Sequence, residues 1–308
     1  MLDLVTCGNI CVDIFLPPHR RPPPGGLTQI PTLEIVPGGN GSNTAIAAAR
    51  LGVKSAVAGV LGDDLFGRDL RRFLEDEEVD VSLVTHLERR QSPSTVVLND
   101  ESGERSFVFY AGTDADFALP ERVFQACGRR FHFAGPELLG SFWPHGTVDA
   151  ARRLNAAGFL LSLDTFVEPG PTVIEDHRAL LPLLDVAMPN EEEGRGISGQ
   201  REPRDICRYL CDAGVKTAVV KRGAGGAIWL QGGKFFEATA ARVPVVDTCG
   251  AGDNFSGAFL AAMLRGRPLQ ECLEIGCAMG TRCVTAKGSL TATADREFLA
   301  RLRARLER

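Results

Sequence analysis

The chain has 308 residues, of which 44% are hydrophobic and 24% are charged, and its formal net charge is −5 at pH 7. This length supplies a core for one large domain, alone or with a small satellite. A nucleic-acid-binding protein more often carries a basic balance or a basic stripe, so the acidic balance argues against that class. No apolar run reaches the roughly 18 residues of a membrane span.

The N-terminus and the cysteines favour a reducing compartment. Residues 1–15 are interrupted by Asp3, Gly8, Asn9 and Asp13, whereas a signal peptide needs a basic start and an unbroken apolar segment. The nine cysteines include no CxxC pair and their number is odd, whereas disulfide frameworks belong to short secreted chains. We therefore expect reduced, mostly buried thiols in a cytoplasmic protein.

Short apolar runs alternate with helical patterns along most of the chain. The runs typical of strands are 3–7, 55–62, 131–135, 158–164, 183–190 and 216–223. The helical patterns include 42–52, 65–79 and the apolar run 255–264. This rhythm predicts a mostly parallel sheet with helices on both faces. Because ligands of such sheets bind at the carboxyl ends of the strands, polar residues directly after these runs are candidates for a site.

Two regions interrupt this series. Residues 11–36 hold a loop rich in Pro, Gly and Arg between two strand-like pieces. Residues 94–110 alternate with a period of two around the turn residues 99–103, which predicts a hairpin. We expect both to form a small sheet that projects from a single domain spanning 1–308, as a lid formed by approximately 11–36 and 94–112. A flap that serves only dimerisation or decoration is the alternative.

The segment DTCGAGDNFSGAFLAAML, residues 247–264, places two glycines, an alanine and an acid before an apolar run. Gly250, Ala251 and Gly252 would lie at a helix N-terminus, where several N–H groups lack an intrahelical acceptor. An anion can approach these donors because no side chain intervenes, and the helix dipole favours it. Asp253 would then lie in the first turn beside that anion. A plain N-cap carboxylate would explain Asp253 but not the glycines.

Polar residues recur at comparable places elsewhere. Asn40 and Asn43 lie near the start of the helix that follows three glycines, and their amides suit hydroxyl groups. Asp13 follows the first strand and can accept two hydrogen bonds from neighbouring sugar hydroxyls. Glu193 would share a helix face with Asn190, and a carboxylate with an amide near phosphate suggests magnesium held partly through water. Taken singly, a capped helix, a surface aspartate and a solvated acidic turn explain these features as well.

Several motifs together resemble the ribokinase-like (PfkB) carbohydrate kinase family. The chain has no GxxxxGK[ST] phosphate loop, and its GxG matches do not complete GxGxxG. The motifs GNICVD, GGNGSN, PNEEE and DTCGAGD stand in the order of the family, and VVKRGAGG (219–226) adds a fifth. The similarity runs from about residue 3 to about residue 290, and the joint occurrence of the motifs argues against coincidence.

The resemblance implies an α/β fold: a ribokinase-like three-layer α/β/α domain with a mostly parallel central sheet and a small β-sheet lid. It also implies ATP-dependent phosphorylation of a primary hydroxyl of a sugar or sugar-like substrate, with Mg²⁺ and, in many members, K⁺. Asp253 matches the catalytic base. The anion hole matches Gly250, Ala251 and Gly252, and the sugar-contacting positions match Asp13, Gly39, Asn40 and Asn43. We further expect a homodimer formed through the lid.

The remaining matches concern the nucleotide and the cations. Asn190 matches a position near the triphosphate, and Glu193 one near magnesium. Residues 221–226 match the nucleotide-side loop of the family, with Lys221, Arg222, Gly223 and Gly226 as its contacts. A monovalent-cation site matches with Asp247, Cys249, Cys283, Ala286 and Gly288.

Departures from the family pattern bear on the substrate. Position 40 is Asn where several members carry Lys, and the strand LSLD continues as TFVEPG, without the Asn and Arg of the sugar-acid and fructose kinases. The sugar-contacting positions bring one negative charge and no positive one. We therefore expect an uncharged or acidic sugar rather than a sugar phosphate, since burying an unpaired dianion is costly. The evidence against this expectation is three arginines in the predicted lid that could bind a phosphate: Arg20, Arg21 and Arg105.

Two other functions stay open at this point. A nucleoside kinase of the same family would need an apolar wall, which could come from Phe15, Phe107, Phe109 and Tyr110. A non-catalytic sugar-binding regulatory protein would have lost Asp253 or the glycines, and both are present. The sequence does not identify the sugar, sugar acid or nucleoside, nor the role of the loop 17–26.

Overall fold

The centre of the protein is an eight-stranded sheet with the order β14-β13-β12-β11-β10-β9-β1-β4. A computed structural model describes residues 2–20, 22, 24–99, 105–125, 128–166 and 173–307. The strands are β1 (Leu2–Gly8), β4 (Ser55–Ala58), β9 (Gly128–Ala134), β10 (Leu160–Asp164), β11 (Val186–Ala187), β12 (Thr217–Lys221), β13 (Ala227–Gln231) and β14 (Lys234–Ala238). Those from β4 to β12 pair in parallel, while β13 and β14 form an antiparallel edge.

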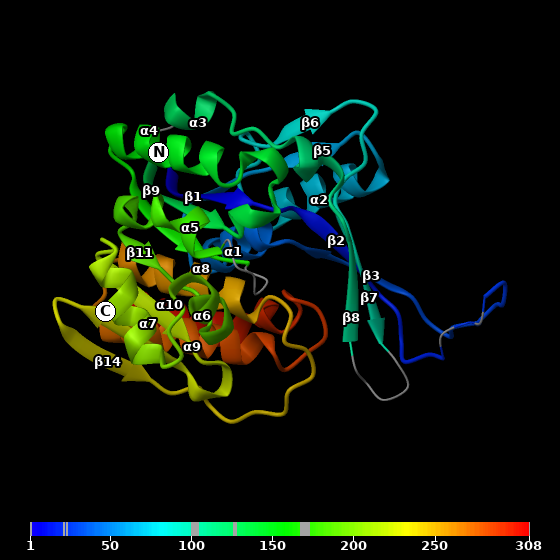
Figure 1. Cartoon of the computed structure of the whole chain (residues 1–308). Coiled ribbons are helices and arrows are strands. Elements are labelled where there is room, and N and C mark those ends of the chain that lie inside the picture. The colour runs from blue at the N-terminus through cyan, green and yellow to red at the C-terminus, as the bar shows by residue number, and fades with distance from the viewer. Residues whose placement is uncertain are drawn as a thin grey trace.

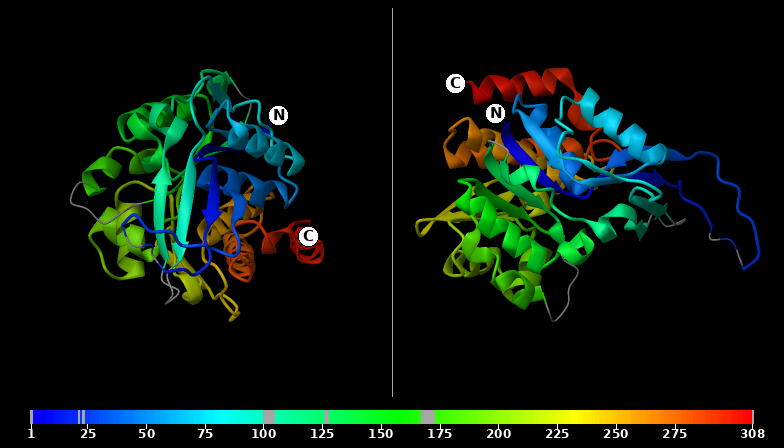
Figure 2. Two further views of the ribbon diagram at one scale, coloured as in Figure 1. Left: turned by 90° about the vertical axis from the view of Figure 1, so that its right-hand side faces the viewer. Right: turned by 90° about the horizontal axis from the view of Figure 1, so that it is seen from above.

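Helices cover both faces of this sheet, which confirms the predicted three-layer arrangement (Figures 1 and 2). The helices are α1 (Asn40–Ala49), α2 (Leu65–Asp76), α3 (Arg122–Gln125), α4 (His145–Ala156), α5 (Val173–Arg178), α6 (Glu191–Ser198), α7 (Pro203–Asp212), α8 (Ala251–Leu264), α9 (Leu269–Cys283) and α10 (Arg296–Leu306). Among the described residues, none of these helices is long and apolar enough to cross a membrane.

The alternation of side chains along β1 divides the core between the two faces. Leu4 packs with the cluster that includes Phe259 of α8, and its neighbour Val5 packs with the cluster that includes Leu154 of α4. The helix α8 lies between α1 and α9 and is apolar on nearly all sides. Its first turn is therefore held at one fixed place at the carboxyl edge of the sheet.

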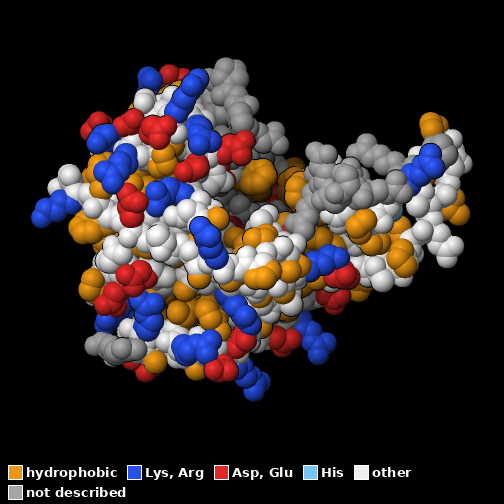
Figure 3. All heavy atoms as spheres, turned by 90° about the horizontal axis from the view of Figure 1, so that it is seen from below, with side chains coloured by type: hydrophobic (Ala, Val, Ile, Leu, Met, Phe, Trp, Pro, Cys, Tyr) orange, Lys and Arg blue, Asp and Glu red, His pale blue; other side chains and the backbone are white. Residues whose placement is uncertain are grey.

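A second, four-stranded sheet projects from this body (Figure 1). Its order is β3-β2-β7-β8, from the strands β2 (Cys11–Phe15), β3 (Glu34–Gly38), β7 (Ser94–Asn99) and β8 (Arg105–Tyr110). The predicted small sheet and hairpin are thus present, while the turn residues 100–103 and Arg21 lie outside the described residues. Hydrophobic side chains are exposed on this arm and on the loop that leads from it (Figure 3), among them Leu27, Ile35, Phe107 and Phe109.

Two sequence expectations were wrong in detail. The run 55–62 is not one strand: it breaks at Gly59 into β4 and β5 (Val60–Gly62), and β5 pairs with β6 (Thr85–Leu87) in a separate sheet. A Cβ at 59 would meet Ile10 Cδ1 at 2.4 Å, so this position requires glycine where the chain leaves the main sheet. Phe15 does not contribute an aromatic wall, because it is 1% exposed and packed inside.

Candidate active site

The first turn of α8 has the bare backbone expected from its sequence. Gly250 is the N-cap, and its φ of 72° lies in the left-handed region. A Cβ at this position would approach the Cβ of Ser289 to 2.3 Å, so both conformation and space require glycine. Ala251 and Gly252 follow as the first helical residues, and the N–H groups of a first turn have no intrahelical acceptor. This end of α8 can therefore receive an anion.

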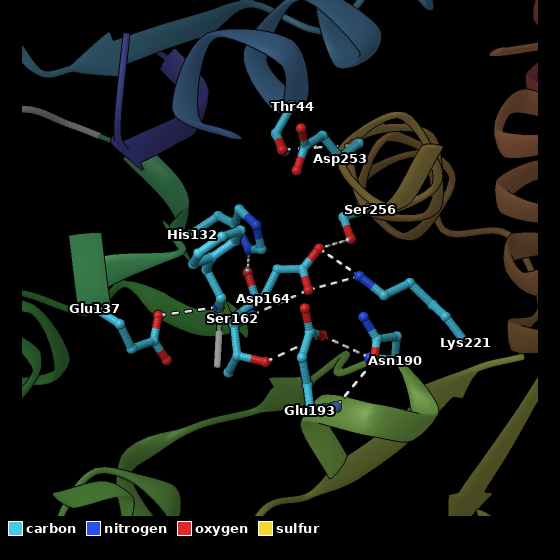
Figure 4. A network of polar contacts seen from close by, with 12 residues as sticks. Thr44, His132, Glu137, Ser162, Asp164, Asn190, Glu193, Lys221, Asp253 and Ser256 are labelled. Atoms are coloured by element: carbon cyan, nitrogen blue, oxygen red, sulfur yellow. Dashed lines mark hydrogen bonds and ion pairs between the residues drawn. The ribbon is translucent and has the colours of Figure 1, made fainter. Parts of the chain in front are cut away.

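Asp253 is fixed in the same turn by α1 (Figure 4). Its Oδ2 accepts a hydrogen bond of 2.9 Å from Nδ2 of Asn43, whose Oδ1 accepts one of 3.0 Å from Ser289. Burial raises the pKa of Asp253 to about 6, and the negative charges of Asp164 and Asp13 add to this effect. A carboxylate with a pKa near neutrality is suited to accept a proton.

Asp164 and Lys221 form a buried ion pair beside this turn. Asp164 ends β10 and Lys221 ends β12, and Nζ lies 2.6 Å from both carboxylate oxygens. Ser256 of α8 donates a hydrogen bond of 2.8 Å to Asp164 Oδ2. Burial alone would lower the pKa of Lys221, but Asp164 and Glu193 outweigh it and raise the pKa. Lys221 is therefore an ammonium ion in the folded protein.

Asn190 and Glu193 share the start of α6, as the sequence predicts, through a capping box. Asn190 Oδ1 accepts from the N–H of Glu193 at 2.9 Å, and Glu193 Oε2 accepts from the N–H of Asn190 at 2.7 Å. The carboxylates of Glu193 and Asp164 point toward one another (Figure 4). Burial and Asp164 both raise the pKa of Glu193, although Lys221 opposes them. Among the described residues no three acids, histidines or cysteines converge on one point to bind a metal directly, so a magnesium ion here would be held by Glu193 through water.

Asp13 approaches Asp253 from the small sheet. Its carboxylate lies against Gly38, where a Cβ would come within 2.3 Å of Oδ2, and Cys11 Sγ lies 3.6 Å from Oδ1. Burial raises the pKa of Asp13 to about 6. Its charge in turn raises the pKa of Asp253, so the two acids lie within electrostatic range of each other. Asp13 therefore brings a charge from the small sheet to the site that contains Asp253.

The other sugar-contacting candidates lie at the start of α1. Gly39 is the N-cap of this helix and Asn40 is its first residue. The amide of Asn40 lies close to the end of β9, since a Cβ on Gly135 would meet its Nδ2 at 2.6 Å. Arg20 is described and exposed, whereas the side chain of Arg105 lies outside what the structure describes.

The candidates for the nucleotide loop do not all point into the site, and the difference begins after Lys221. Gly223 begins the 3-10 turn Gly223–Gly225, and Gly226 leads into β13. The N–H of Arg222 donates to the carbonyl of Gly226 at 2.8 Å, which closes this turn. The guanidinium of Arg222 turns outward to Glu237, at 3.2 Å. Of this group, therefore, only the side chain of Lys221 lies among the acids Asp164, Glu193 and Asp253.

The candidates for the monovalent-cation site are largely brought together. The carboxylate of Asp247 accepts hydrogen bonds from the N–H groups of Cys249 at 3.0 Å and Gly288 at 2.9 Å. Cys283 Sγ lies 3.3 Å from the carbonyl oxygen of Cys249. Burial raises the pKa of the Cys283 thiol to about 12, so it offers no thiolate. Ala286 is partly buried in the turn between Cys283 and Gly288.

Sequence reasoning missed Asp164, which binds Lys221, and Ser256, which donates to Asp164. Asp164 ends a predicted strand, and the rule that ligands bind at the carboxyl ends of parallel strands could have pointed to it. Ser256 stands within an apolar helical run, and its role follows only from its contact with Asp164. No signal in the sequence would have found it.

Comparison with known proteins identifies the class to which this fold and site belong. Residues 1–296 match the profile of the pfkB family carbohydrate kinases. The chain is 30% identical to a ribokinase of Arabidopsis thaliana over 97% of its own length and 80% of that protein. It is 31% identical to an aminoimidazole riboside kinase of Salmonella typhimurium over 83% of its own length and 84% of that protein.

A solved structure shows the same fold. The Arabidopsis thaliana ribokinase complexed with ribose and ATP superimposes with a TM-score of 0.84 and 25% identity, covering 98% of each chain. The protein belongs to the pfkB family of carbohydrate kinases. It is an ATP-dependent carbohydrate kinase with the ribokinase-like fold.

Proposed function

We propose that the protein phosphorylates a primary hydroxyl of an uncharged or acidic sugar, with Asp253 as the general base. The hydroxyl oxygen attacks the γ-phosphorus of ATP, the bond from that phosphorus to the β–γ bridging oxygen breaks, and ADP leaves. The hydroxyl proton passes to Asp253, and the product is a sugar phosphate. The observation that carries this proposal is the first turn of α8, where a carboxylate with a raised pKa stands beside a helix N-terminus free of side chains.

The same turn supplies the electrostatic part of catalysis. N–H groups of Gly250, Ala251 and Gly252 would face the charge that develops on the transferring group, and fixed donors of this kind stabilise a transition state strongly. Magnesium, when bound, neutralises charge on the phosphates, and Glu193 would hold it through water. The residues that would face ATP are Asn190, Lys221, Gly223, Gly226 and the backbone of Arg222, whose guanidinium pairs with Glu237. The small sheet would act as a lid that excludes water.

Hydrogen-bonding groups without a positive charge support the choice of substrate. Asp13 would accept bonds from sugar hydroxyls, and Asn40 and Asn43 would donate and accept. These positions offer no cation to a second phosphate, and Arg20 faces solvent. The ribokinase relative is named for ribose, an uncharged sugar.

A nucleoside is the second candidate for the acceptor. Phe107 and Phe109 of β8 are exposed on the small sheet, at 57% and 39%, and could cover a base. One relative is named as a riboside kinase. The same aromatic residues also suit the homodimer that we propose through the lid, since exposed apolar side chains mark contact surfaces.

Two further features belong to the proposal. A potassium ion held near Asp247, Cys249, Cys283, Ala286 and Gly288 would order the loop that leads into the anion hole. We also propose that the enzyme works in the cytoplasm, because its described cysteines are free thiols and most are buried.

A screen of ATP consumption tests the function. Free pentoses and hexoses, sugar acids, sugar phosphates and nucleosides are each incubated with ATP, Mg²⁺ and the enzyme, and ADP and the phosphate ester are measured. We expect the highest kcat/KM for a free sugar or sugar acid. A preference for a phosphorylated sugar would overturn the substrate class, and a preference for nucleosides would favour the second candidate.

A further inference from the structure

The ammonium of Lys221 lies beside the first turn of α8. A residue that contacted only the nucleotide would not need to reach this turn. A Cβ built on Gly252 would meet Lys221 Nζ at 3.0 Å, and Asp164 Oδ2 at 3.9 Å. Gly252 is one of the anion-hole residues, and the next residue is Asp253. The side chain reaches this turn from the end of β12 (Figure 4).

The hydrogen bonds of Lys221 leave one donor for a ligand. An ammonium group has three N–H donors. Two point to the oxygens of Asp164, each at 2.6 Å, and no other described residue accepts from Nζ. The side chain is 11% exposed. The remaining donor is therefore directed within a nearly closed site rather than into bulk water.

The surrounding charges make Lys221 the cation of this network. Asp164, Glu193 and Asp253 all act on it electrostatically, and all three are acids. Arg222, the adjacent basic residue, pairs with Glu237 instead. Incoming phosphate adds more negative charge to the same place. Among the residues labelled in Figure 4, Lys221 carries the positive charge that can offset the charge of the phosphate.

We propose that Lys221 contacts the transferring phosphoryl group at the first turn of α8 and stabilises its charge, and that Asp164 is the residue that positions it. This inference rests on the proposed kinase function and changes the role of Lys221 from nucleotide-loop contact to catalytic residue. The phosphoryl oxygen takes the third donor of the ammonium. No bond to Lys221 forms or breaks, and no proton leaves it.

The position of Asp164 explains how the ammonium is aimed. Its Oδ1 accepts the N–H of Thr165 at 3.0 Å and its Oδ2 accepts the hydroxyl of Ser256 at 2.8 Å, so the residue after β10 and the helix α8 both fix the carboxylate. A carboxylate anchored on two elements directs a flexible lysine to one point. Without Asp164, Lys221 would keep its positive charge, but its ammonium group would no longer be held at one position.

The test compares two nucleotides in the variants Lys221→Met and Asp164→Asn. Binding of ADP and of AMP-PNP, each with Mg²⁺, is measured by calorimetry, and kcat and KM are measured with the best sugar. For Lys221→Met we expect AMP-PNP to bind at least tenfold more weakly while ADP binds within about threefold of wild type. We expect kcat to fall about 10²–10³-fold, the usual loss for one such donor.

Positioning by Asp164 has its own signature. Asp164→Asn should lower kcat about tenfold and weaken AMP-PNP binding less than Lys221→Met does, with little change in the KM of the sugar or the affinity for ADP. In a Lys221→Met background the same substitution should cause no further loss, because it acts through Lys221. The double variant removes both charges of the pair, so it also keeps the test valid if Lys221→Met alone fails to fold.

Lys216 gives a matched control. It pairs with Asp185 at 2.7 Å just before the start of β12, at the opposite end of the strand, and its side chain is 72% exposed. Lys216→Met should leave both affinities and kcat unchanged.

An equal loss of ADP and AMP-PNP affinity in Lys221→Met would overturn the proposal and return Lys221 to the nucleotide loop. Unchanged kcat with a lowered melting temperature would overturn it as well, since that marks a structural ion pair. If wild type phosphorylates no substrate of the screen, the proposed function itself fails, which is a separate outcome.

Discussion

Replacing Asp253 by asparagine separates catalysis from folding in this protein. The amide can still accept the hydrogen bond from Asn43, which is 2.9 Å long in the wild type, so the shape of the site is retained. It cannot accept the hydroxyl proton. Loss of a general base lowers kcat about 10²–10⁴-fold, or about 3–5 kcal/mol of transition-state stabilisation.

Whereas kcat falls in Asp253→Asn, the free energy of unfolding should stay equal or rise. Raising the pKa from 3.8 to about 6 means that the folded protein disfavours the carboxylate at pH 7, by at most about 3 kcal/mol. This penalty is present above the folded pKa and disappears as pH falls below the unfolded value. A neutral amide removes it, so we expect equal or higher stability, by up to about 2 kcal/mol after allowance for partial exposure.

Both quantities can be measured on one preparation. ADP release gives kcat, and urea unfolding at pH 7 gives the free energy of unfolding, with calorimetry to confirm that ATP and sugar still bind. Retention of more than a tenth of the wild-type kcat would refute the assignment of the base. A fall in stability together with kcat would show instead that the variant had disrupted the site.

Three further results are expected. The kcat/KM should fall at least tenfold per pH unit below about pH 6, because Asp253 acts only when deprotonated, and a profile flat to pH 5 would contradict this. Asp13→Ala should raise the KM of the sugar about 10–100-fold and leave that of ATP nearly unchanged, since its bonds are to hydroxyls; equal effects would remove it from the sugar site. Potassium should raise the rate above that in sodium or a bulky ammonium salt at fixed ionic strength, and equal rates would count against the cation site.

Much of the fold follows from local patterns in the sequence. The runs around 131–135, 158–164 and 216–223 all lie on strands of the main sheet, because apolar runs between helical patterns leave few other arrangements. The place of the N-terminus of α8 at residues 250–252 was predicted, since glycines before an apolar run have a direct structural meaning. The run 55–62 was mistaken for one strand because the chain changes from one sheet to another at Gly59, and this pairing depends on distant segments.

The site was harder to predict because its contacts join distant segments. Asp164 and Lys221 are 57 residues apart, and Asp164 and Ser256 are 92 apart. Each stands at the end of a strand or within a helix where a lone polar residue has an ordinary explanation. Only the parallel sheet, which brings the ends of β10 and β12 to one edge, makes a network of them.

The two glycines before Asp253 are required for different reasons, and this difference can be measured. Alanine at 250 would force a left-handed φ on a residue with a Cβ, and that Cβ would lie 2.3 Å from the Cβ of Ser289. We expect a loss of at least about 2 kcal/mol of stability. Gly252 is helical, and its nearest neighbour is the end of a flexible side chain, Lys221 Nζ at 3.0 Å.

Alanine at 252 should therefore be tolerated by the fold, with stability unchanged or up to about 1 kcal/mol higher because alanine favours the helix. The ammonium of Lys221 must move by a few tenths of an ångström, and kcat should fall at least tenfold, on the premise that a small misplacement at the reacting centre is costly. Urea unfolding and steady-state kinetics on both variants give the comparison. If Gly252→Ala kept full activity, or if both variants lost stability equally, the second glycine would not serve to admit Lys221 to the anion hole.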